Sequence, residues 1–486
     1  MTLDSRTRWY ALMVLCSGTL MIVLDSTIVN VALPSIREDL GFSETSLAWV
    51  VNAYLLTFGG FLLLGGRLGD LYGHRRLFLG GIALFTIASL ACGLANSQET
   101  LIAARAVQGL GGAVASAVSL SLTMTLFTEP AERAKAMGVF GFVASGGGSI
   151  GVLLGGILTD VLDWHWIFLV NIPIGVAVIA FSLRLLPGAR AQASEQKLDV
   201  AGAVTVTAAL MLAVYAIING NQEGWLSART LGLLAVAVAL LGTFLTIESR
   251  VSSPLMPLGL IRKRNVAVAN TVGVLWAAAM FAWFFLSALY LQLVLGYSPL
   301  KVGLAFLAGN IVMGILSVSV SARLVMRFGI KKPLATGLLV AATGLLWLAR
   351  APVDGTYVTD VLPSMVLLGF GAGIAFNPVL LAAMSDVEPQ EAGLASGIVN
   401  TAFMMGGALG MAVLASLAAS RTDTLMADGD SHLAALTGGY HLAFLVGALF
   451  AISAAVIGAA LLHISGAPAA AHGESSAAAP TPAEVV

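Results

Sequence analysis

The chain has 486 residues, of which 58% are hydrophobic and only 10% are charged, and its mean hydropathy is +0.94. A composition this apolar excludes a soluble protein, because most of the chain would have to be kept out of water. The formal net charge of −1 excludes a nucleic-acid partner, since phosphate binding needs clustered cations.

Apolar stretches follow one another along the chain, and most reach the roughly 20 residues that cross ~30 Å of hydrocarbon. The first is too long for a cleaved leader, so we expect it to remain as an anchor. The pattern predicts an all-α polytopic membrane protein with about 14 transmembrane helices. The stretches lie near 9–33, 47–67, 77–95, 101–125, 136–158, 166–186, 199–219, 231–249, 266–293, 303–325, 334–350, 359–384, 393–418 and 440–463.

Lysine and arginine are concentrated in alternate connections, where 18 of them lie, against 5 in the opposite set. Because cytoplasmic loops carry the excess of cations, we expect both termini to face the cytoplasm. The cell membrane of a bacterium is the expected location. Residues 466–486, rich in alanine and proline, are expected to form a disordered cytoplasmic tail.

Two pairs of segments repeat at nearly the same spacing. EPAERAKAMG from Glu129 resembles EPQEAGLASG from Glu388 at an offset of 259, and GRLGDLYGHRR from Gly66 resembles ARLVMRFGIKK from Ala322 at an offset of 256. A duplicated six-helix unit, interrupted by an inserted helix pair, explains both offsets. We therefore predict two pseudo-symmetric six-helix bundles at 1–190 and 261–465, an inserted pair with its linkers at 191–260, and a tail at 466–486.

Two charged residues lie inside predicted helices. Asp25 is the only acid well inside a span, and burying it costs at least ~2.5 kcal/mol. Arg105, in the fourth helix, is expected at the same depth, about 6 Å from the outer boundary. We predict that Asp25 is the protonation site and that Arg105 governs its loading as a central cavity opens and closes. The alternative is a static ion pair that holds the two helices together.

Several amides are candidate polar contacts in the cavity. Asn30 follows Asp25 by five positions and Gln108 follows Arg105 by three, so both are predicted to extend the polar contact. Simple hydrogen bonding between helices explains them equally well. In the second half, an apolar pocket with sparse polar contacts is the hypothesis, and a lipid-facing or core position is the alternative. The amides concerned are Asn270, Asn310, Asn377 and Asn400.

The loop GRLGDLYGHRR after the second helix combines glycines, cations and one acid. Gly66 and Gly73 permit a tight turn, and Arg75 and Arg76 fix topology. We expect Asp70 to latch an inner gate by docking on a helix N-terminus of the other half. The alternative is a topology signal with an ordinary turn.

The fifth helix carries Gly147, Gly151 and Gly155 at a spacing of four. A stripe of glycines on one helix face lets another backbone approach closely, so we predict a helix-packing role. Generic packing of small residues explains the spacing equally well.

Four motifs carry a family resemblance: LDSTIVNVALP, GRLGDLYGHRR, RAVQGLGGA, and the glycine-rich fifth helix followed by WHWIFLVNIPIG. With these, residues 9–463 resemble the major facilitator superfamily, specifically its fourteen-helix drug:proton antiporter branch. The resemblance implies proton-driven export of lipophilic, often cationic, compounds such as antibiotics by alternating access, with Asp25, Arg105 and Asp70 in the roles above. One departure is Val152, which stands where that branch has proline and weakens the antiporter motif.

The remaining residues favour a transporter over an enzyme. No Gly-Lys dipeptide occurs, so a phosphate-binding P-loop is absent and the energy source is expected to be an ion gradient and not ATP. Six histidines and two cysteines show no ligand spacing, so we expect no metal and no cofactor. The expected partners are a small-molecule substrate, protons and the lipid bilayer, and the chain is expected to be a monomer. The alternative function is a passive facilitator of a small metabolite, and a membrane-embedded enzyme is a more distant one.

Overall fold

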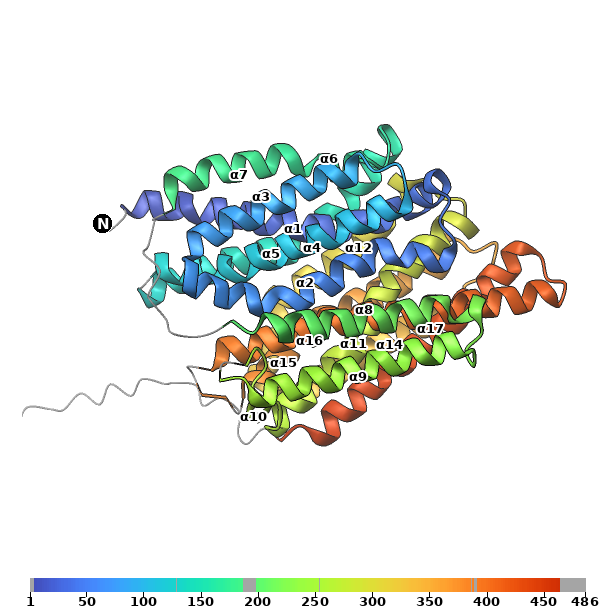
Figure 1. Cartoon of the computed structure of the whole chain (residues 1–486). Coiled ribbons are helices and arrows are strands. Elements are labelled where there is room, and N and C mark those ends of the chain that lie inside the picture. Colours follow the sequence, from blue (N-terminus) through green and yellow to red (C-terminus); the bar gives the residue numbers. More distant parts are fainter. Residues whose placement is uncertain are drawn as a thin grey trace, which may run out of the picture.

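The computed structural model describes residues 4–127, 129–186, 198–252, 254–385, 387–388 and 391–463, and this part of the chain is almost entirely helical (Figure 1). The first half contains α1 (Ser5–Leu40), α2 (Glu44–Tyr72), α3 (His74–Gly93), α4 (Gln98–Leu126), α5 (Pro130–Val161), α6 (Trp166–Leu169) and α7 (Asn171–Leu185). Next come α8 (Val200–Glu223), α9 (Ala228–Arg250) and the short α10 (Leu258–Ile261). The second half contains α11 (Arg264–Leu289), α12 (Pro299–Ile315), α13 (Ser321–Phe328), α14 (Lys331–Leu348), α15 (Leu362–Met384), α16 (Ala392–Ala427) and α17 (His432–Leu461), with π-helical turns at Tyr290–Val294, Leu316–Val320 and Tyr357–Val361.

The predicted all-α membrane fold is confirmed. Twelve helical stretches in the described ranges are apolar and long enough to cross a membrane. Two further helices occupy predicted spans but fall short in the length or hydropathy of their apolar stretch. Helix α5 contains the shorter apolar stretch Ile150–Val161, and α14 has 18 residues, or ~27 Å, and begins with two lysines.

The sixth predicted span, 166–186, is not one continuous helix. It is divided into α6 and α7 at Val170. Pro173 explains the break, because its ring lacks an N–H and would clash with the carbonyl of Leu169 in an unbroken helix. The break places Asn171 at the first position of α7.

The same packing pattern occurs in both halves, as the internal repeat predicts. In the first half the contacting pairs include α3 with α4, α2 with α4, α1 with α5, and α3 with α7. Their counterparts in the second half are α14 with α15, α12 with α15, α11 with α16, and α14 with α17. Equivalent helices therefore take equivalent places in the two bundles.

The two halves meet along two seams, one between α2 and α16 and one between α5 and α12. Helices α8 and α9 pack on each other as the predicted inserted pair, and α8 also packs on α2 and α16 (Figure 1). The inserted pair therefore covers the α2–α16 seam. The predicted tail, 466–486, lies outside the described residues.

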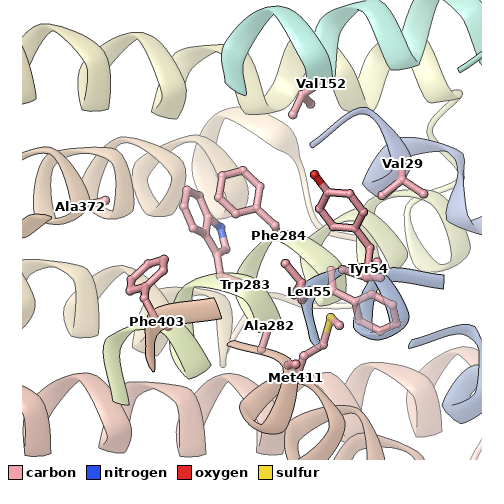
Figure 2. Packing of buried hydrophobic residues seen from close by; sticks show 14 of the residues in the cluster. Val29, Tyr54, Leu55, Val152, Ala282, Trp283, Phe284, Ala372, Phe403 and Met411 are labelled. Carbon is pink, nitrogen blue, oxygen red and sulfur yellow. The ribbon is translucent and has the colours of Figure 1, made fainter. Parts of the chain in front are cut away.

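Large apolar side chains from both halves fill the interior. Tyr54 and Leu55 of α2 belong to the same cluster as Trp283 and Phe284 of α11 (Figure 2). The Trp283 and Phe284 rings lie 4.4 Å apart, centroid to centroid. Asp25 of α1 and Arg105 of α4 are buried within the first half of this interior.

Candidate functional site

Asp25 of α1 is completely buried and lies at the centre of a polar network. Its Oδ2 is 2.5 Å from Nη1 of Arg105 on α4. Its Oδ1 accepts hydrogen bonds from Nε2 of Gln108 at 2.7 Å and from Nδ2 of Asn171 at 3.0 Å. Every one of these partners is a donor, which is the arrangement that suits an ionised carboxylate.

Arg105 is also completely buried, and it has partners besides Asp25. Its Nε donates to the carbonyl of Val50 on α2 at 2.9 Å, and its Nη1 donates to Oε1 of Gln108 at 2.6 Å. Its guanidinium carbon lies 4.4 Å from the ring centroid of Tyr54 and 5.5 Å from that of Phe168. Cation–π contacts of this kind partly compensate a buried cation for the loss of its hydration.

Three residues of this network were not predicted from the sequence, and one of them is Cys92, whose thiol donates to Oε1 of Gln108 at 3.6 Å. The Oγ of Ser89 on α3 accepts hydrogen bonds from Nε2 of Gln108 at 2.7 Å and from Nδ2 of Asn171 at 3.3 Å. The signal for Asn171 was its place in WHWIFLVNIPIG, and the signal for Ser89 was a polar side chain inside an otherwise apolar helix. The network therefore draws side chains from α1, α3, α4 and α7, and a carbonyl from α2.

The other predicted amides do not join this network. Asn30 is buried, but its amide donates to the Thr27 carbonyl on its own helix. Asn270 and Asn400 also donate within their own helices. Asn377 donates to the Ser317 carbonyl, and the Nδ2 of Asn310 has no hydrogen-bond partner.

One of these amides lines a small apolar cleft. Asn400 borders a small cleft together with Trp276, Phe376 and Phe403. A larger apolar cavity, of about 240 Å³, lies where α2, α8, α9, α11 and α16 meet. Its walls include Leu63, Leu210, Phe244 and Met405, and Thr401 is the one lining residue with a polar side chain.

Only Gly73 separates α2 from α3, whereas Gly66, which was expected in the loop, lies within α2 because the helix continues to Tyr72. Gly73 has φ +92°, which favours glycine, and it ends α2 and precedes α3. Arg75 donates to the carbonyl of Leu183 at 2.6 Å, in the last turn of α7, and Arg76 is exposed. Gly66 has open space around it, and the Asp70 side chain lies outside what the structure describes.

The glycine stripe of α5 approaches α1 closely. A Cβ added to Gly151 would lie 2.9 Å from the Leu24 carbonyl oxygen, and one added to Gly155 would lie 2.6 Å from that of Ile28. At Gly147 a Cβ would meet the side chain of Val23 at 2.9 Å.

The neighbouring Gly156 faces the second half. A Cβ there would lie 2.7 Å from the Pro299 carbonyl oxygen at the start of α12. Adjacent glycines therefore serve two interfaces, one inside the first half and one on the α5–α12 seam.

The sequence is similar to those of several resistance and export proteins. The puromycin resistance protein of Streptomyces alboniger is 40% identical over 450 residues, which cover 91% of this chain and 89% of that protein. The cephamycin export protein of Amycolatopsis lactamdurans is 39% identical and covers 94% of this chain and 93% of its own length. The tetracenomycin C resistance and export protein of Streptomyces glaucescens is 35% identical, with coverages of 86% and 78%. A family profile described as Major Facilitator Superfamily matches residues 15–411, and the chain belongs to that superfamily.

Proposed function

We propose that the chain is a secondary active transporter of a bacterial cell membrane that exports small hydrophobic or amphipathic compounds, including antibiotics, in exchange for protons. Similarity to three resistance and export proteins over most of the chain supports export as the direction of transport. The proposal includes alternating access between the bundles at 1–190 and 261–465, a monomer with both termini in the cytoplasm, and no use of ATP and no enzymatic step.

The observation that carries proton exchange is the fully buried pair of Asp25 and Arg105. Protonation of Asp25 removes the charge that Arg105 neutralises. Arg105 then keeps the Val50 carbonyl, Gln108 and the Tyr54 ring as partners. The guanidinium group of Arg105 therefore keeps polar and aromatic contacts while Asp25 is neutral.

Loading and release of the proton require access to water. Removing one member of a buried ion pair costs about 3–5 kcal/mol while its partner stays dry, so protonation is favourable only when the cavity is hydrated. Alternating access supplies that hydration on each side of the membrane in turn. One proton moving down 100 mV supplies ~2.3 kcal/mol, enough for roughly a fifty-fold concentration ratio of cargo.

The test is accumulation of a lipophilic dye against its gradient in proteoliposomes with an imposed pH gradient. We expect Asp25→Asn to abolish accumulation, whereas Glu38→Gln, which removes an exposed acid on the same helix, retains it. Accumulation by folded Asp25→Asn protein would contradict proton loading at Asp25. Dye efflux by the parent chain that persists after the pH gradient is collapsed would instead favour the passive facilitator.

A further inference from the structure

A pair of buried carboxyl groups lies at the base of the inserted helices. Asp199 precedes α8, and its Oδ1 accepts a hydrogen bond from the N–H of Gly202 at 2.8 Å. Glu248 lies in the last turn of α9, and its Oε2 accepts from the N–H of Met256 at 3.0 Å. Each residue is only 3% exposed, and Leu255 packs in one apolar cluster with Ala203 of α8, which places the linker that binds Glu248 beside the helix start that Asp199 caps.

The second oxygen of each carboxyl group has no hydrogen-bond donor. These atoms are Asp199 Oδ2 and Glu248 Oε1, and both are inaccessible to solvent. Two buried carboxylates this close cannot both stay ionised without a compensating cation. A bound proton would supply the missing hydrogen-bond donor and would also remove the excess negative charge.

Among the residues that the structure describes, the neighbouring cations have other partners or face solvent. Arg67, on the adjacent α2, donates to the Pro254 carbonyl, and Arg250, at the end of α9, is exposed. Glu391, which precedes α16, is paired with Lys263 at 3.0 Å. Within the described ranges, neither carboxyl group of the inserted pair forms a salt bridge.

We propose that Asp199 and Glu248 together bind one proton, in a second proton site separate from Asp25. The proton is bound to Glu248 Oε1, which then donates a hydrogen bond to Asp199 Oδ2. With the two backbone hydrogen bonds, each of the four carboxyl oxygens then has a partner. Asp199 keeps the negative charge because it caps the positive end of α8, whereas Glu248 lies near the negative end of α9. A metal ion is a poorer fit, because hard cations require about six oxygen ligands.

The shared proton joins the start of α8 to the end of α9 and to the linker after it. That linker supplies Leu255 and Met256 to the apolar cavity, and Phe244 lies one helical turn before Glu248 in the same wall. Loss of the proton would set two like charges against each other at this edge of the cavity. This proton site lies at the Leu255–Met256 side of the cavity and does not depend on which compound the chain carries.

The test is reversible unfolding of the full-length protein in mixed detergent micelles across pH 5 to 9. The native pair holds one proton more than the unfolded chain at neutral pH, so the stability that it contributes falls as pH rises. In Glu248→Gln the amide donates to Asp199 Oδ2 without titrating. The ratio of unfolding constants between parent and Glu248→Gln should therefore change by up to about tenfold per pH unit.

Two further variants sharpen the result. Asp199→Asn keeps a capping side chain and places a donor opposite Glu248, so it should also lose this pH dependence. Glu38→Gln makes the same change at an exposed site and should follow the parent at every pH. Infrared spectra at pH 7 should show one more protonated carboxyl band in the parent than in Glu248→Gln. Parallel pH profiles for parent and Glu248→Gln, or identical carboxyl bands, would overturn the proposal.

Discussion

The carbonyl oxygen of Val50 lies 2.9 Å from Nε of Arg105 and fixes that side chain to α2 independently of Asp25. Arg105 is thus bound to two other helices by different atoms of one guanidinium group, since Nη1 meets Asp25 on α1. Breaking the contact with Asp25 does not release the arginine from its site. The ion pair and the contact of Arg105 with α2 can therefore be tested separately.

A double variant distinguishes proton carriage from a static ion pair. Asp25→Asn with Arg105→Gln removes both buried charges, so no charge is left uncompensated. A purely structural pair predicts that the double variant regains proton-driven accumulation that Asp25→Asn lacks. We expect accumulation to stay absent while thermal stability recovers by about 3–5 kcal/mol relative to Asp25→Asn. Dye accumulation and unfolding in detergent measure the two effects separately.

Asn171→Ala removes an amide that binds both Asp25 and Ser89. A hydrogen bond to a charged group is worth about 1.5–3 kcal/mol, so we expect a loss of stability of that size and slower proton-driven export. Asn30→Ala is the control, because that buried amide bonds only within its own helix. Equal effects of the two substitutions on export would remove Asn171 from the site.

Gly156→Leu tests the contact between the halves at the α5–α12 seam. The added side chain collides with the backbone of Pro299 and Leu300, and overpacking of this kind costs about 1–3 kcal/mol. We expect α5 and the start of α12 to stay apart, and we expect export to be lost.

The measurement is the distance between spin labels on cysteines introduced at Val161 and Leu304, two exposed positions near this contact, after both native cysteines are replaced by serine. Gly314→Leu, in α12 with open space around it, should leave the distance distribution unchanged. A short distance that persists in Gly156→Leu would contradict the expected separation.

Gly66, near the end of α2, and Gly73, which follows α2, should respond in opposite ways to alanine. Gly73 has φ +92°, so alanine there should cost about 1–2 kcal/mol. Gly66 lies within α2 with open space around it, so alanine there should stabilise the helix by about 0.5–1 kcal/mol. Unfolding in detergent gives both values, and a loss of stability in Gly66→Ala would point to a contact that forms in another conformation.

The sequence predicts the ion pair because only two charges lie deep in apolar helices, and helix geometry places both at one depth. It predicts the packing face of α5 because glycines at a spacing of four must share a side. Asn30 was a poorer inference, because five positions turn a helix by about 140° away from Asp25. Ser89 and Asn171 could not be selected, since their orientation depends on the rotation of α3 and on the helix break at Val170.

The inserted helices make the two flanks of the transporter unequal. Helix α8 covers the α2–α16 seam, because it packs on both of these helices. Helix α9 packs on α8 and forms a second layer there. A lipophilic molecule that diffuses within a leaflet therefore meets a wall on that flank. The α5–α12 flank lacks such a covering helix pair among the described residues, and there the close contact of Gly156 with α12 is what separates the seam from lipid.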